Sequence, residues 1–265
     1  MTVDKLRLFC RLIGISFKSQ MQHRASFLML ISTYFLSTSI DIVGIWVLFD
    51  RFKMVQGWTL KEVAIIYGIM HIGFSIPEAF ARGFDNFGLL IRNGDFDRVL
   101  LRPIGTLFQM ASREIQWIRL GRFLQGSIIL AWGCMERQFS LNSLHALIIF
   151  LAILGTAALF YGLFILQATL TFWTTETLEL MNIATFGGLE VGQYPMSIYK
   201  PLLRGFFTFI VPLACVAYYP IATALNHESI PIWLGTIAPF GGLIFLYFSI
   251  RLWKLGVRHY SSTGS

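Results

Sequence analysis

Charged side chains are scarce in this chain. Only 13% of the 265 residues are Asp, Glu, Lys or Arg, whereas a typical soluble domain has about 25%. Hydrophobic residues make up 55%, so too few polar side chains remain to cover a surface that faces water. This composition argues against a soluble enzyme, a disordered chain and a nucleic-acid-binding protein. It predicts a polytopic membrane protein.

Recognisable catalytic motifs are also missing. The sequence has no GxSxG nucleophile elbow, no HExxH zinc motif and no Walker A loop. Its three cysteines, Cys10, Cys134 and Cys215, lack the spacing of a metal site. Asp95-Phe96-Asp97 resembles a metal-binding DxD motif, but arginines surround it and no third ligand is near. We therefore expect no catalytic residue, no metal site and no cofactor bound by this chain.

The apolar residues come in long runs rather than in alternation, which favours helices over strands. We predict an all-α membrane protein, a single transmembrane domain over 1–265 with six spans and no separate soluble domain. The predicted spans are 27–49, 63–80, 115–135, 144–173, 205–225 and 232–250. A polar segment, 174–204, separates the fourth span from the fifth. Four prolines between 212 and 239 favour an extracellular re-entrant hairpin between the last two spans.

The first 25 residues are basic and amphipathic. Arg7, Arg11 and Lys18 fall on one face of a helical projection, opposite an apolar face. Because charges run throughout the segment, we do not expect a cleaved signal peptide. The pattern favours a helix lying in the membrane interface over a merely basic flank before the first span.

Basic residues also predict the orientation. With the N-terminus inside, 17 of the 21 Lys and Arg residues fall on the inner side and four on the outer side. Both termini are then cytoplasmic. The surplus positive charge contacts anionic lipid of the inner leaflet, and no nucleic-acid partner is needed to explain it.

Three ionisable residues lie inside predicted spans, namely Asp41, His71 and Glu78. A charge at membrane depth is costly unless it faces a partner or water. These residues either line a substrate path or are structural. The structural interpretation is favoured for His71 and Glu78, and the two interpretations are evenly matched for Asp41.

The inner loop between the second and third spans, 82–103, has the most informative pattern. Asn93-Gly94 predicts a turn, Asp95 an N-cap, and Pro103 the end of a short helix over 96–101. The apolar side chains of Phe96, Val99 and Leu100 share one face of this helix, opposite Arg98 and Arg102. The helix either docks its apolar face into a soluble partner or lies on the inner leaflet.

The segment Gly94-Asp-Phe-Asp-Arg-Val-Leu-Leu-Arg-Pro103 resembles a motif of ABC-2 type exporter permeases, in the branch with six spans and roughly 260 residues. Tyr194-Pro195…Tyr199 and Pro212…Tyr218-Tyr219-Pro220 are also similar to that branch. The resemblance implies a transmembrane subunit that pairs with a second permease and two cytoplasmic ATPase subunits. ATP and Mg²⁺ would bind in those ATPases. It further implies that 82–103 holds the coupling helix and that 1–25 is the family's interfacial helix.

On this basis we expect the following residues to form the ATPase-coupling segment: Arg92, Asn93, Gly94, Asp95, Phe96, Asp97, Arg98, Leu100, Arg102 and Pro103. The leading hypothesis is the permease of a bacterial inner-membrane exporter that moves an amphipathic or hydrophobic substrate outward. A membrane-embedded lipid-modifying enzyme and an ATP-independent secondary transporter or channel are the alternatives. The substrate itself, and whether the second permease is an identical copy, stay open.

Overall fold

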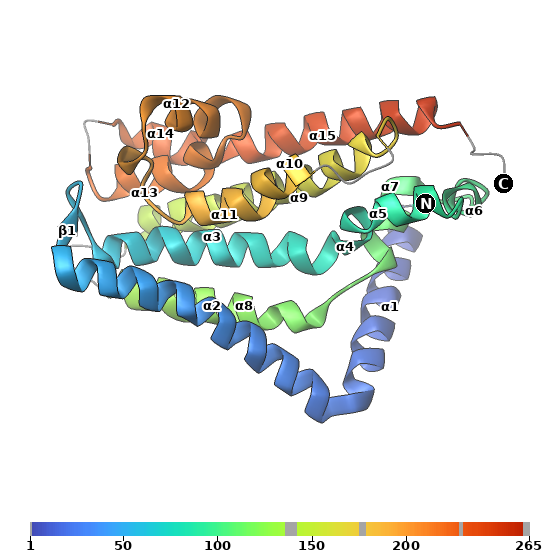
Figure 1. Ribbon diagram of the computed structural model, residues 1–265, viewed down its shortest axis with the longest axis horizontal. Coiled ribbons are helices and arrows are strands. Elements are labelled where there is room, and N and C mark those ends of the chain that lie inside the picture. Colours follow the sequence, from blue (N-terminus) through green and yellow to red (C-terminus); the bar gives the residue numbers. More distant parts are fainter. Residues whose placement is uncertain (1, 136–141, 175–178, 228–229, 262–265) are drawn as a thin grey trace.

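The computed structural model describes residues 2–135, 142–174, 179–227 and 230–261. Its long helices run roughly along the longest axis of the molecule, so that loops gather at two ends (Figure 1). The strands in the described ranges are β1 (Met54–Val55) and β2 (Trp58–Thr59), which form one short hairpin. The predicted all-α class is therefore confirmed.

Four helical segments are long and apolar enough to cross a membrane: Arg7–Phe52, Leu60–Phe80, Ser143–Leu170 and Ile232–His259. They contain α2 (Arg24–Phe52), α3 (Leu60–Phe80), α9 (Ser143–Leu170), and α14 (Ile232–Ile237) with α15 (Phe240–His259). The predicted third span is the 15-residue helix α8 (Leu120–Cys134). At 1.5 Å per residue it is about 22 Å long, less than the hydrocarbon core. The six-span count stays a prediction.

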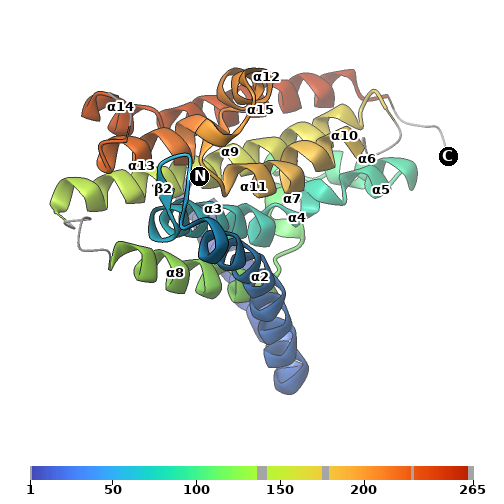
Figure 2. The same cartoon turned by 60° about the vertical axis from the view of Figure 1, so that its left-hand side comes forward.

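Helix α3 is the centre of the bundle. Its N-terminus has a capping box, in which the Thr59 hydroxyl accepts from the Glu62 amide and the Glu62 carboxylate accepts from the Thr59 amide. Most of its side chains are buried, because α2, α8, α9 and α11 (Gly188–Gly192) pack around it. Figures 1 and 2 both place α3 between α2 and α11.

Glycines let the helix backbones approach closely. A Cβ atom on Gly68 of α3 would lie only 2.6 Å from the Cβ atom of Leu130 on α8. Gly155 of α9 and Gly242 of α15 meet in the same way, because a Cβ on Gly242 would clash with the carbonyl of Gly155. Close packing of this kind drives the association of helices in lipid, where the hydrophobic effect does not act between them.

Short helices occupy the end of the bundle that the basic residues assign to the inside. They are α4 (Arg82–Asp85), α5 (Phe87–Arg92), α6 (Phe96–Leu100), α7 (Thr106–Arg113) and η2 (Trp117–Arg119). The N-terminal α1 (Thr2–Gln20) joins α2 through η1 (Met21–His23). It stands crosswise to the long helices (Figure 1), as a helix lying in the membrane interface would.

The predicted polar segment after α9 is largely helical. α10 (Glu179–Asn182), η3 (Ile183–Gly187) and α11 follow one another without a break. They run antiparallel to α3, because Phe186 contacts Phe74 with ring centroids 5.5 Å apart while Gln193 reaches His71, nearer the N-terminus of α3. Length and hydropathy alone do not identify this stretch as a membrane span, because polar residues such as Glu190 interrupt it.

The predicted fifth span is not one straight helix. Pro201–Ile210 and Ala214–Ala224 are bent by 84° at Val211–Leu213, where Pro212 lacks an amide proton. The first arm holds α12 (Pro201–Gly205) and η5 (Phe206–Ile210). The second holds η6 (Ala214–Tyr218) and α13 (Tyr219–Ala224). The 3-10 turn η4 (Met196–Ile198) precedes them.

This hairpin changes the charge count. The Arg204 guanidinium lies 5.8 Å from the Tyr218 ring, and Tyr218 contacts Trp58 in the β-hairpin at the opposite end from Glu78. Arg204 therefore lies at the end of the bundle opposite Glu78, which the basic residues assign to the outside, although it is one of the 17 basic residues that the sequence analysis counts on the inner side. When Lys200 is moved with Arg204, 15 Lys and Arg residues remain on the inner side and six fall on the outer side. This distribution still satisfies the positive-inside rule. Arg137, one of the six, lies outside the described residues.

The glycine contacts give a stability prediction. We expect Gly242→Leu to destabilise the chain by about 1–3 kcal/mol, because the α9–α15 contact leaves no room for a side chain. Thermal unfolding of the purified chain in detergent measures this effect. Gly44→Leu is the matched control, since nothing lies within 4 Å of a Cβ there. Equal melting temperatures for the two variants would contradict the proposed packing.

Candidate coupling and transport sites

The predicted coupling helix forms as α6, one residue shorter than expected. Gly94 has φ +69°, a left-handed conformation that suits glycine in the turn after Asn93. Asp95 occupies the N-cap position, but its side chain makes no capping hydrogen bond. It pairs instead with Arg98, with Oδ1 and Nη1 3.4 Å apart.

An aromatic cluster holds α6 against the bundle. Its members come from α4, α5 and α6, from the turn just after α9, and from α15 and the residue after it. They are Phe84, Phe87, Phe96, Phe172, Trp253 and Tyr260. The Phe96 ring lies 5.0 Å from Phe87, 5.6 Å from Phe172 and 5.0 Å from Tyr260. Burial and the nearby Asp97 carboxylate raise the pKa of Tyr260. α6 is thus tied to both α9 and α15.

Phe96 and Val99, on the apolar face of α6 that the sequence analysis expects to meet a partner or the inner leaflet, are not part of its outward surface. Phe96 is fully buried and Val99 is 4% exposed, because both pack against the chain's own helices. The outward surface, which we call the coupling face, consists of Arg98, Leu100, Leu101, Arg102 and Pro103. Leu101 is 85% exposed, the largest apolar contribution to it. Arg92 and Asn93 are exposed beside this face.

Helix α1 is attached to the start of η2 and not to the bundle core. Ser16 Oγ and Gln20 Nε2 both donate to the Ile115 carbonyl, and the Gln20 side chain accepts from the Trp117 amide at 3.1 Å. Arg7, Arg11 and Lys18 are all exposed. They are free to meet lipid head groups along the helix.

Glu78 forms a buried ion-pair triad with two arginines, Arg119 in the turn η2 before α8 and Arg122 in α8 itself. Its Oε1 lies 2.7 Å from Arg119 Nη1, and its Oε2 lies 3.1 Å from Arg122 Nε. The Glu78 side chain is 2% exposed. Each guanidinium also lies over an aromatic ring, Arg119 over Tyr34 and Arg122 over Phe74. The triad joins α3 to the start of α8.

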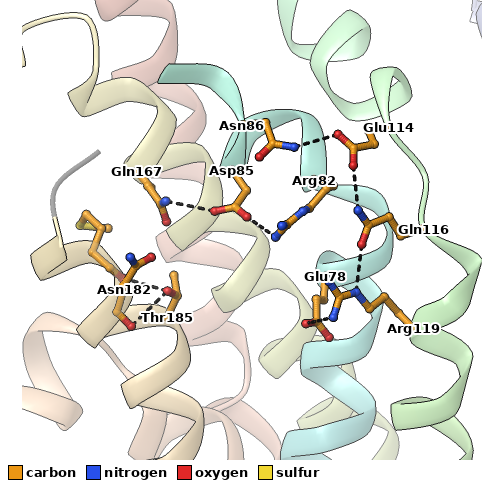
Figure 3. Close-up of polar contacts among 11 residues, drawn as sticks. Glu78, Arg82, Asp85, Asn86, Glu114, Gln116, Arg119, Gln167, Asn182 and Thr185 are labelled. Carbon is orange, nitrogen blue, oxygen red and sulfur yellow. Dashed lines mark hydrogen bonds and ion pairs between the residues drawn. The ribbon is translucent and has the colours of Figure 1, made fainter. Parts of the chain in front are cut away.

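A polar network extends the triad across the inner end of the bundle (Figure 3). Arg119 Nε donates to Gln116, Gln116 donates to Glu114, and Asn86 Nδ2 donates to the other oxygen of Glu114 at 2.8 Å. On the facing side, Arg82 pairs with Asp85, which also accepts from Gln167 of α9. These hydrogen bonds join the region of α4 both to the segment that precedes α8 and to α9.

His71 is fully buried at the middle of α3. Its ring stacks on Tyr67 at 3.9 Å, and its Nε2 lies 3.2 Å from Gln193 Oε1. Gln193 Nε2 donates in turn to Glu190 at 2.8 Å. The structure thus connects His71 to α11 and not to Glu78.

Asp41 lies half-buried on α2, which packs against α3 and α8. His71 is thus connected to Gln193 at the end of α11, whereas Glu78 belongs to the triad with the two arginines. Within the described residues, no group of three His, Cys, Asp or Glu side chains is placed to hold a metal ion.

Sequence reasoning missed the partners of these residues. Arg119 and Arg122 enter the sequence analysis only among the 17 basic residues on the inner side, and Glu190 and Gln193 lie in the segment 174–204, which it describes only as polar. No spacing rule links Glu78 to an arginine 41 or 44 positions later. Polar residues such as Glu190 on α11 can indicate a functional helix inside the membrane. Hydropathy does not identify such a helix, because the same residues lower its mean value.

Comparison with known proteins decides the family. The family model described as "ABC-2 family transporter protein" matches residues 35–264, nearly the whole chain. The chain belongs to the ABC-2 transporter family. The resemblance noted at Gly94–Pro103 is confirmed, and this ABC-2 protein is a multi-pass membrane permease of an ABC-type transporter, a family that associates with an ABC ATPase. No curated protein and no solved structure matches it.

The triad predicts the effect of removing one charge. Glu78→Gln leaves two buried guanidiniums without a carboxylate, and we expect it to destabilise this ABC-2 protein by about 3–5 kcal/mol. Asp50→Asn should cost under about 1 kcal/mol, because its partner Lys53 and Asp50 itself are both largely exposed. Thermal unfolding in detergent compares the two. A melting temperature of Glu78→Gln equal to that of Asp50→Asn would show that the triad is not stabilising.

Proposed function

We propose that this chain is the permease subunit of an exporter that is driven by a separate ATPase. Two cytoplasmic ATPase subunits hold ATP and Mg²⁺, and two permeases, identical or homologous, form the transmembrane part. The coupling face on α6 is the observation on which this proposal chiefly rests. It presents two arginines and two exposed leucines at the end where the basic residues gather.

The described contacts supply a route for transmitting motion. A push on the coupling face reaches α9 and α15 through the aromatic cluster around Phe96. It reaches α3 and α8 through the polar network and the Glu78 triad. A partner shifts a conformational equilibrium only if it contacts the two states differently. An ATPase dimer that closes on ATP satisfies this requirement.

The outer hairpin supports outward release. Pro201–Ile210 and Ala214–Ala224 meet at an 84° bend beside Pro212, as in a broken span or a re-entrant loop. Irregular backbone at membrane depth persists where protein or water satisfies its polar groups. We place the chain in the bacterial inner membrane with both termini in the cytoplasm. The substrate leaves between the two permeases.

The coupling face gives the direct test. We expect Arg98→Glu combined with Arg102→Glu to abolish ATPase stimulation by the permease and to release the ATPase in pull-down assays. The reason is that charge reversal replaces attraction by repulsion at the docking surface. Leu100→Pro, which breaks α6, should have the same effect.

Arg258→Glu is the matched control. Arg258 is exposed near the C-terminal end of α15, at the same end of the molecule but outside the coupling face. We expect this variant to retain ATPase binding and stimulation. Full stimulation in the double charge reversal would disprove docking through α6.

A further inference from the structure

A cavity lies at the inner end of the molecule, where α1 meets α7 and the segment that follows α6. Its apolar lining comes from Leu8 and Leu12 of α1, from Ile104, and from Phe108 of α7. The volume is about 360 Å³, within the range of roughly 300–1,000 Å³ that small-molecule sites occupy. Figure 1 shows α1, α6 and α7 together at this end. We call this space the inner cavity.

Two arginines also line the inner cavity. Arg102 follows α6 and Arg113 ends α7, and both are exposed. Among the described residues, neither guanidinium is paired with a carboxylate, and the lining includes no Asp or Glu. Glu114, next to Arg113 in the sequence, accepts from Asn86 and Gln116 instead. The inner cavity therefore combines two positive charges with an apolar lining.

The segment after α6 is hydrogen-bonded to α7, which fixes the shape of the cavity. The Gln109 side chain of α7 donates to the Val99 carbonyl at 2.9 Å and to the Ile104 carbonyl at 2.7 Å. Helix α1 packs beside them, since the Phe9 and Phe108 ring centroids are 5.9 Å apart. The two arginines are thus carried by segments that are attached to each other.

This lining favours a ligand with a phosphate group and an apolar body. A guanidinium binds phosphate oxygens through two parallel N–H donors. The apolar side chains suit the first part of an acyl chain, and an interfacial α1 lies at the level of the lipid head groups. The arginines would repel a choline or ethanolamine ammonium, and the described lining offers it no carboxylate. An anionic phospholipid therefore fits better than a zwitterionic one.

We propose that the inner cavity binds the head group of an anionic phospholipid of the inner leaflet, such as phosphatidylglycerol. Its phosphate pairs with Arg102 and Arg113, and its acyl chains lie along α1. Arg102 also belongs to the coupling face, so the bound lipid ties that face to α7 and favours the arrangement on which an ATPase docks. This regulatory effect rests on the proposed function, whereas lipid binding does not.

Native mass spectrometry tests the binding step. The full chain in detergent is mixed with equal amounts of dioleoyl phosphatidylglycerol and dioleoyl phosphatidylcholine, which have the same acyl chains. We expect the tightest-bound lipid to be phosphatidylglycerol. Arg113→Gln should weaken its binding by about tenfold, because charge-assisted hydrogen bonds are lost. Arg113→Lys keeps the charge without the paired donors and should recover only part of the affinity.

Arg258→Gln is the matched control, because Arg258 is an exposed arginine at the same end and outside the inner cavity. It should bind phosphatidylglycerol like the unmodified chain. Because Arg113 is exposed, its glutamine variant keeps the fold, and its melting temperature verifies this. Equal binding of the two lipids, or equal affinity of Arg113→Gln and Arg258→Gln, would overturn the proposal. Displacement of the lipid by soluble glycerol phosphate would also overturn it, by assigning the cavity to free phosphates.

The regulatory step is measured in nanodiscs that contain the full chain and its ATPase. Stimulation of the ATPase should rise when phosphatidylglycerol replaces part of the phosphatidylcholine, and Arg113→Gln should lose this rise. An equal rise in Arg113→Gln would disprove regulation through the inner cavity. If the lipid binds as expected but no ATPase couples to the chain, only the proposed function fails.

Discussion

The ion pairs between Glu78 and the two arginines are the constraint that organises the inner half of this protein. None of the three charged groups could be placed in a bilayer alone, and they are accommodated because they neutralise one another in part. Their pairing fixes the inner end of α3 against the start of α8. The turn η2, which leads directly into α8, holds Arg119 against Glu78.

The triad also links two regions that would otherwise be independent. On its inner side it continues through Gln116 and Glu114 to Asn86, next to the coupling segment. On its other side Arg122 anchors the triad in α8 and lies over the Phe74 ring of α3. The contacts of the triad therefore connect the segment that follows α3 with the helices α3 and α8.

Features set by local sequence were predicted well. The Asn93-Gly94 turn, the position of Asp95 and the short helix before Pro103 follow from neighbouring residues, and so do the long apolar helices. The orientation of α6 was not predicted, because it depends on Phe172 and Trp253, which are distant in the sequence. The prolines predicted a re-entrant hairpin between the fifth and sixth spans, whereas the bend lies inside the predicted fifth span, between Ile210 and Ala214. The helical run through α11 was missed because Glu190 and Gln193 lower its hydropathy, although these polar groups are the feature that distinguishes it.

Burial explains why residues predicted to act together are separated. His71 is linked to α11 through Gln193, whereas Glu78 is neutralised by arginines nearer the inner end. Helical projection alone places both on the same span without showing their partners. The division assigns Glu78 a role in positioning the helices α3 and α8.

The central claim is that an ABC-type ATPase docks on the coupling face of α6. The most direct measurement introduces a photo-crosslinking benzoylphenylalanine at Leu101 in the full chain, in its native membrane, and identifies the captured protein by mass spectrometry. Capture of an ATPase with an ATP-binding-cassette sequence at Leu101, but not when the probe replaces Trp46 near the outer end of α2, is the predicted result. Failure to capture such an ATPase at Leu101, or equal capture at both positions, would contradict the claim.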